Sequence, residues 1–241
     1  MSRFWIEPEW PVPPGVRAAS TLRRGGVSIG PYRSLNLGAH VGDEPSRVSE
    51  NRHRLREALS LPAEPVWLNQ VHGKHVIRAD VSTYRSADAA FTCQTGIVCT
   101  VMTADCLPVL LCSKEGDRVA AVHAGWKGLA AGVIEAAVEA LEGDDLLAWL
   151  GPAIGPDAFE VGHEVRETFV RKRAAFAAAF RQTENAKWLA DLYHLARIVL
   201  NDAGVSAIYG GGFCTFGNAD EFFSYRRDRV TGRMATLIWR E

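Results

Sequence analysis

Three short polar segments contain the residues that could do chemistry. Each places one His or Cys within two residues of a Gly or Asp: LNQVHG from Leu68, TADCLP from Thr103 and VHAGWKG from Val122. Their metal-ligating members, His72, Cys106 and His123, supply two imidazoles and one thiolate. This donor set suits zinc and leaves one tetrahedral position for water or substrate. An open position predicts a catalytic metal, because structural zinc sites are closed.

Each of these residues also has a structural interpretation. The chain has no C-x-x-C pair, so spacing alone does not assemble the three ligands. A buried Cys is usually a small apolar side chain, and a hydrogen-bonded His is more common than a metal ligand. From residue type alone, the metal site is one hypothesis beside these.

The glycine-flanked pair Trp126-Lys127 predicts an anion site. It lies where an apolar strand turns into a helix, and a helix N-terminus offers free backbone N–H groups to an anion. The same glycines also fit a tight strand-to-helix connection. Lys127 favours the anion interpretation because it adds a cation at this turn.

The elements around these segments alternate between strands and helices. Short apolar runs predict strands at 97–103, 107–112, 118–123 and 233–239. Helical spacing predicts helices at 129–141, with Gly143 as the stop, and at 165–180 and 188–202. The pattern indicates a mixed α+β fold, and without a long linker we expect a single domain over residues 1–241.

Composition restricts the class of protein. The 241 residues carry a net charge of −1, so no overall field favours nucleic acid or anionic lipid. No stretch approaches the roughly 20 apolar residues of a membrane span. The five cysteines are an odd number and the N-terminal residues do not resemble a secretory signal, so we expect a cytoplasmic protein.

The whole sequence resembles the YfiH-like laccase-domain family. The resemblance rests on strings in the family's order: SLNLGAHVGD from Ser34, VSENRHRL from Val48, the three polar segments above, LGPAIGP from Leu150, FEVG from Phe159, FFSYRRD from Phe222 and TGRMATLIW from Thr231. It implies a layered α/β/β/α fold with mixed sheets, grouped with cysteine hydrolases. It also implies that His72, Cys106 and His123 are the metal ligands.

Members of this family have been described as laccases, as purine nucleoside phosphorylases and as peptidoglycan-editing factors. A multicopper oxidase needs several copper ions and many His ligands, whereas the remaining His residues here are dispersed. We therefore rank copper and polyphenol oxidation last among these activities. The leading hypothesis is a zinc enzyme that phosphorolyses adenosine, inosine, guanosine and methylthioadenosine, with adenosine deamination as a companion activity.

This hypothesis gives further residues a role. Zinc would lower the pKa of a bound water toward about 7 for deamination, and Asp105 is the candidate proton carrier beside Cys106 and His123. Lys127 and Arg226 are candidates for holding phosphate. The amides of Asn36, Asn69 and Gln70 could contact purine or ribose, although turn-stabilising amides are equally typical.

The alternative hypothesis is a metal-free hydrolase. Cys106 would be the nucleophile and His123 its base, acting as an amidase on UDP-MurNAc-amino acid precursors of peptidoglycan. A metal-carrying partner module is a third possibility, which the open ligand position disfavours. The sequence does not predict an oligomeric state.

Overall fold

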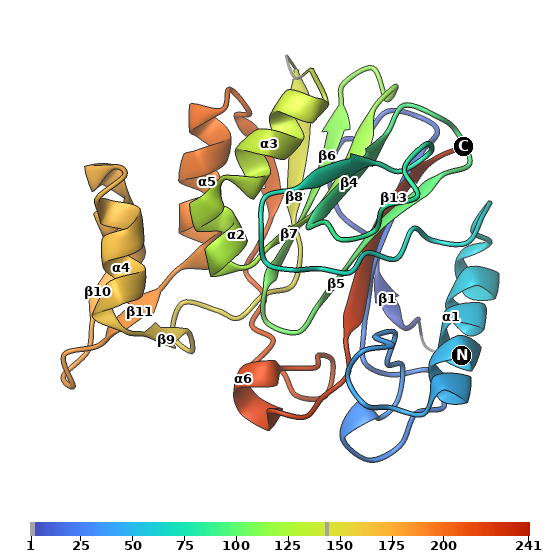
Figure 1. The fold of residues 1–241 in the computed structure, drawn as a ribbon, viewed down its shortest axis with the longest axis horizontal. Helices are drawn as coiled ribbons and strands as arrows, with labels where there is room; N and C mark the ends of the chain where they lie inside the picture. The colour runs from blue at the N-terminus through green and yellow to red at the C-terminus, as the bar shows by residue number, and fades with distance from the viewer. Residues whose placement is uncertain (1–2, 143–144) are drawn as a thin grey trace.

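Two β-sheets packed face to face form the centre of the computed structural model, which describes residues 3–142 and 145–241 (Figure 1). The larger sheet has the order β12-β8-β6-β7-β4-β3 and the smaller has the order β1-β2-β13-β5. The larger sheet contains β3 (Val76–Arg78), β4 (Ala89–Thr92), β6 (Leu107–Ser113), β7 (Val119–Ala124), β8 (Leu146–Leu150) and β12 (Ala207–Gly210). The smaller contains β1 (Trp5–Ile6), β2 (Val16–Thr21), β5 (Val98–Thr103) and β13 (Met234–Arg240).

Helices cover the outer face of each sheet. On the larger sheet lie α2 (Trp126–Ala131), α3 (Val133–Ala140) and α5 (Leu192–Asp202), and α1 (Pro45–Leu59) covers the smaller sheet. Along β6, Val109 and Leu111 pack toward the helices, whereas Leu110 packs between the sheets. A strand buried on both faces reads as a continuous apolar run, which explains the pattern of the sequence. The predicted α/β/β/α layering and mixed sheets are confirmed.

Four predicted strands match β5, β6, β7 and β13 closely. Within the larger sheet, β12–β8 and β3–β4 pair in parallel and the remaining pairs are antiparallel. A peripheral sheet joins β9 (Glu160–Val161), β10 (Phe180–Gln182) and β11 (Trp188–Ala190). The remaining short elements are η1 (Gly30–Tyr32), α4 (His163–Val170), η2 (Ala174–Ala179) and α6 (Tyr225–Asp228).

The bounds predicted for the helix at 129–141 were wrong. The helical segment starts at Trp126, and Gly132 divides it into α2 and α3. Gly132 has a left-handed backbone conformation with φ 96°. Only glycine adopts this conformation without strain, so the residue is a boundary and not a helix interior position. The predicted stop, Gly143, lies outside the described residues.

The other two predicted helices each merged different elements. In 165–180, α4 ends at Val170 and the chain continues through η2 into β10; Phe169 packs on Phe176 and Phe180, so their spacing reflects tertiary contact. In 188–202, β11 precedes α5. Asp191 caps α5 by accepting a hydrogen bond from the backbone N–H of His194. Over the described part of the chain, no helix is both long and apolar enough to cross a bilayer.

The fold predicts a stability effect at Asn51. This fully buried residue of α1 donates to the carbonyls of Ser34 and Asn36 and accepts from the N–H of Val27, which fixes the loop before α1. Replacing Asn51 with Ala leaves these groups without partners and should lower the free energy of unfolding by about 2–4 kcal/mol. Urea denaturation measures the effect. Glu50→Ala, at an exposed position of the same helix, is the control and should leave stability nearly unchanged.

Candidate metal centre

Strand pairing brings the three predicted ligands together. His123 lies near the end of β7, and Cys106 lies in the turn between β5 and β6. Because Leu107 pairs with Ala124, that turn is placed beside the end of β7. His72 comes from the loop before β3. Gly125 allows the close approach, since a Cβ there would lie 2.8 Å from the Cys106 sulfur.

The geometry of the cluster fits one tetrahedral metal. The donor atoms of His72, Cys106 and His123 all lie within 4.8 Å of one another, and Cys106 Sγ lies 3.8 Å from His72 Nε2. A sulfur and a nitrogen bound to the same tetrahedral zinc are about 3.6 Å apart. Within residues 3–142 and 145–241, no other group of three or more metal-ligating side chains occurs. These residues therefore fit a single ion with an open position.

Asp88, which was not among the predicted site residues, orients the cluster. Its fully buried carboxylate is 2.8 Å from His123 Nδ1 through Oδ1, and it accepts hydrogen bonds from the N–H groups of His72 and Gly73 at 2.8 and 2.7 Å. An Nδ1–H bonded to a carboxylate leaves Nε2 of His123 free as a metal ligand. The only signal in the sequence is an acid among small residues immediately before an apolar strand.

Two site residues have left-handed backbone conformations. His72 has φ 60° and Asp105 has φ 93°, conformations that cost a residue with a side chain about 1–2 kcal/mol. The hydrogen bonds from the His72 loop to Asp88 offset this cost. Such strain persists where the surrounding structure holds the backbone in place, as around binding and catalytic sites.

The cluster favours a thiolate even without a metal. Burial raises the pKa of the Cys106 thiol, but the neighbouring His123 and His72 lower it more, to about 6. Burial lowers the pKa of His123, whereas the Cys106 thiolate and the Asp88 carboxylate raise it, to about 9. Metal ligation requires the thiolate form, which this environment supplies near neutral pH.

Asp105, the predicted proton carrier, is held by hydrogen bonds. One carboxylate oxygen accepts from the hydroxyl of Thr215 at 2.6 Å, and the other accepts from the backbone N–H of Arg226 at 2.6 Å. The carboxylate thus joins the turn of Cys106 to the start of α6. A role in proton transfer stays a prediction.

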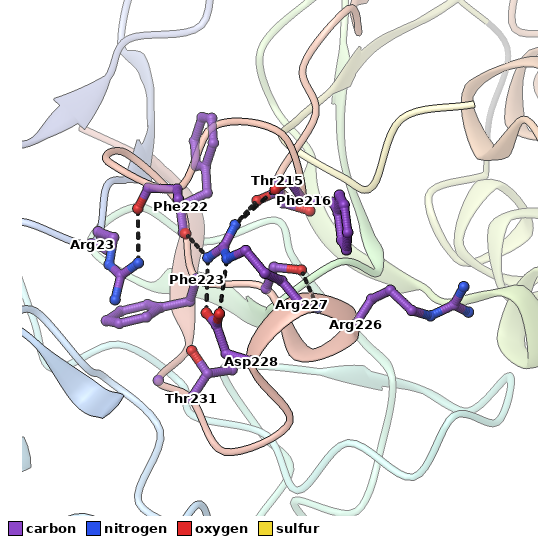
Figure 2. A network of polar contacts seen from close by, with 12 residues as sticks. Arg23, Thr215, Phe216, Phe222, Phe223, Arg226, Arg227, Asp228 and Thr231 are labelled. Atoms are coloured by element: carbon purple, nitrogen blue, oxygen red, sulfur yellow. Dashed lines mark hydrogen bonds and ion pairs between the residues drawn. The ribbon is translucent and has the colours of Figure 1, made fainter. Parts of the chain in front are cut away.

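Arg227 holds the segment that carries Thr215 and the start of α6, and Figure 2 shows its polar contacts. Its guanidinium donates to the carbonyls of Thr215, Phe216 and Phe222 and pairs with Asp228. These bonds tie the start of α6 to the loop that carries the Thr215 hydroxyl. Arg227 lies in the string FFSYRRD, which by itself indicates no role for this residue.

A first cavity of about 360 Å³ opens onto the cluster. It is lined by Val71, His72, Ala104, Asp105, Cys106, Trp126, Lys127, Ile154, Phe159, Leu192, Tyr225 and Arg226. Both predicted cations are therefore in this cavity. Lys127 is exposed, whereas the Arg226 guanidinium lies 5.3 Å from the centre of the Phe159 ring and donates to the carbonyl of Glu160.

The three predicted amides are not equally placed. Asn36 is fully buried and its amide bonds to Gly38, Asp43 and the N–H of Arg233. Substrate contact at Asn36 would require these bonds to break, so the structure favours a positioning role. Asn69 donates to Ser86 and lines neither cavity at the cluster.

Gln70 lies closer to the cluster, in the wall of a second cavity. Its amide pairs with both the N–H and the carbonyl of Met102, at 2.8 and 2.7 Å. The second cavity, about 400 Å³, is also lined by His40, His72, Met102, Thr103, Ala104, Cys106, His123, Tyr225 and Arg233. The sequence gave no reason to place His40, Tyr225 or Arg233 at the site.

The chain is similar to known proteins over almost its whole length. The family model described as multi-copper polyphenol oxidoreductase laccase matches residues 17–241. Purine nucleoside phosphorylase PA4543 of Pseudomonas aeruginosa is 56% identical over 98% of both chains, and purine nucleoside phosphorylase YfiH of Escherichia coli is 56% identical over 97% of this chain and 98% of that protein.

Solved structures share the fold. The crystal structure of Neisseria meningitidis protein NMB0706 has a TM-score of 0.96 and 46% identity, covering 99% of this chain and 100% of that one. YlmD from Geobacillus stearothermophilus has a TM-score of 0.90 and 31% identity, covering 100% of this chain and 97% of that one.

The Asp88 contacts predict a loss of zinc affinity on substitution. Asp88→Asn keeps the size of the side chain but removes the charge that orients His123, so zinc should bind about 10–100-fold more weakly. Competition with a chromophoric chelator measures the affinity. Asp80→Asn is the matched control, because Asp80 is also a largely buried aspartate but pairs with Arg78 and Thr92. Equal affinities in wild type and Asp88→Asn would contradict the orienting role.

The pKa of Cys106 predicts its reactivity in the metal-free protein. Alkylation by iodoacetamide should increase with pH through a midpoint of about 6, because only the thiolate reacts. Cys99 and Cys112 should stay unreactive, since burial raises the pKa of both thiols. Mass spectrometry locates the modified residue. His123→Ala should move the midpoint upward, and zinc should protect Cys106.

Proposed function

The chain belongs to the family described as multi-copper polyphenol oxidoreductase laccase, and from this premise we propose that it is a zinc-dependent purine nucleoside phosphorylase. The observation that carries the proposal is the open cluster of two imidazoles and one thiolate beside a cavity with aromatic walls. The names of the relatives agree with this activity. The single cluster in the described part of the chain gives little support to multicopper oxidation.

The first cavity suits a purine nucleoside in size and lining. Its volume is within the range of about 300–1,000 Å³ typical of small-molecule sites. Trp126, Phe159 and Tyr225 supply aromatic faces for a purine ring, and Ile154 and Leu192 add apolar surface. The ribose would then lie toward His72 and Cys106, where the cluster meets the cavity.

Charge around the cavity suits an anionic co-substrate. Lys127 lies exposed at its edge, and Arg226 forms part of its wall. Both cations increase the local concentration of phosphate by electrostatic attraction. A zinc ion held by the three ligands would supply Lewis acidity to the substrate.

The proposed substrates are adenosine, inosine, guanosine and methylthioadenosine, with adenosine deamination as a second activity. Deamination needs a proton carrier, and Asp105 is the carboxyl group closest in sequence to the ligands. We also propose a cytoplasmic location, which agrees with five free cysteines in the structure.

A second candidate function rests on Asp88, His123 and Cys106. A thiol with a pKa of about 6, an imidazole beside it and a carboxylate on that imidazole form a Cys-His-Asp arrangement. Without a metal, this arrangement could act as the amidase on UDP-MurNAc-amino acids. Zinc on the thiolate would suppress it, so the two functions exclude each other at one site.

An assay of the purified protein tests the proposal. Protein prepared without added metal should contain about one zinc per chain and release free base and ribose 1-phosphate from inosine only when phosphate is present. The variants His72→Ala and Cys106→Ser should each lose zinc. Their kcat/KM should fall by at least about 100-fold. His75→Ala, an exposed His three residues from His72, is the matched control.

The two candidate functions give opposite results for one variant. A cysteine nucleophile would tolerate His72→Ala better than a zinc enzyme would, because His123, paired with Asp88, would remain as its base. Phosphorolysis would be rejected if the wild-type protein contained no metal and turned over no nucleoside. Amidase activity that is retained in His72→Ala would then establish the hydrolase.

A further inference from the structure

The metal cluster lies between two cavities. They share His72, Ala104, Cys106 and Tyr225 but otherwise have separate linings. The second cavity contains all three ligand residues, whereas the first contains only His72 and Cys106. Two reactants, one in each cavity, would therefore meet at the cluster.

The two cavities differ in charge. The first contains the Asp105 carboxylate beside the cations Lys127 and Arg226. The residues that line the second include no Asp or Glu, and they include Arg233 and His40. Across residues 3–142 and 145–241, the ion pairs do not include Arg233. Arg233 is largely buried, and its charge is available to an anion in this cavity.

Arg233 is held in position with part of its guanidinium free. Its Nη1 donates to the carbonyls of Thr231 and Gly232, both at 3.0 Å, and its backbone N–H donates to Asn36 at 2.9 Å. Its Nε and Nη2 have no hydrogen-bond partner in the described part of the chain. The side chain passes so close to Gly38 that a Cβ there would lie 2.9 Å from Arg233 Cγ. A guanidinium fixed in this way binds an oxyanion with little loss of side-chain freedom.

His40 lies close enough to two arginines for them to affect its pKa. Burial, Arg233 and Arg52 all lower its pKa. The Arg233 guanidinium also lies 5.9 Å from the centre of the Tyr225 ring, which both cavities share. Arg233 is therefore the cation that an anion in the second cavity would meet.

We propose that the second cavity is the subsite for inorganic phosphate and that Arg233 is the residue that binds it. This inference rests on the proposed phosphorolysis, and it assigns inorganic phosphate, the second substrate, to the second cavity. Arg233 would present Nε and Nη2 to two phosphate oxygens, while the purine occupies the first cavity. Lys127 and Arg226 would attract phosphate without holding it.

The arrangement places the phosphate and the base on different sides of the ribose. A phosphate oxygen forms the new bond to C1′ as the bond from C1′ to N9 of the purine breaks. The electron pair of the broken bond goes to the purine. The proton of hydrogen phosphate ends on that base, so the products are ribose 1-phosphate and the neutral purine.

Isothermal titration of the zinc-containing protein with inorganic phosphate tests the subsite without turnover. Wild type should bind phosphate, and Arg233→Ala and Arg233→Lys should bind it at least about 10-fold more weakly, since lysine keeps the charge but loses the paired donors. Arg229→Ala, at an exposed arginine outside both cavities, should bind as wild type does. Zinc content and thermal unfolding show that each variant is folded and loaded.

The outcomes separate the subsite from the proposed function. Unchanged phosphate affinity in both Arg233 variants, or a loss confined to Lys127→Ala, would overturn the subsite. Phosphorolysis of inosine with an unchanged KM for phosphate in Arg233→Lys would overturn it as well. Phosphate bound through Arg233 and displaced by ribose 1-phosphate, but with no base released from any nucleoside, would support the subsite and reject phosphorolysis.

Discussion

The Asp88 carboxylate is buried where its own segment meets the loop of residues 71–73 and strand β7. Donors from that loop and from β7 supply its hydrogen bonds. It bonds the imidazole of His123 on β7 and accepts from the backbone N–H groups of residues 71–73. A buried carboxylate is costly unless each oxygen is hydrogen-bonded, and here both are. One charge therefore sets the tautomer of one ligand and the backbone position of another.

The remaining ligand depends on a second buried carboxylate. Asp105 lies in the same turn as Cys106, and its oxygens bind Thr215 and the start of α6. Arg227 in turn holds the loop of Thr215 to α6 (Figure 2). The residues near the C-terminus thereby hold the turn that carries Cys106, and Tyr225, Arg226 and Arg233 form part of the cavity walls. Polar networks of this kind rigidify a site when every member is satisfied.

The sheets position the cluster but do not supply its chemistry. The antiparallel pairing of β6 with β7 places the Cys106 turn beside the end of β7, and Gly125 lets sulfur and backbone approach. The apolar strands give rigidity, whereas the ligands lie at strand ends and in loops, where side chains are free to face a cavity. The fold and the relatives' names agree on an enzyme of this family, and its substrates rest on the cavities beside the cluster.

The sequence by itself determined the mixed α+β class and the central strands, which follow from local apolar patterns. The layered arrangement and the choice of the three candidate ligands came from the resemblance of motif strings such as TADC and HAGW to a known family. It did not determine the break at Gly132 or the end of α4, because left-handed glycine and the packing of Phe169 on Phe176 override helical spacing. Nor did it find Asp88 or Arg233. Their roles arise from contacts between residues 15 to 197 positions apart, which no local pattern encodes and only the packed chain decides.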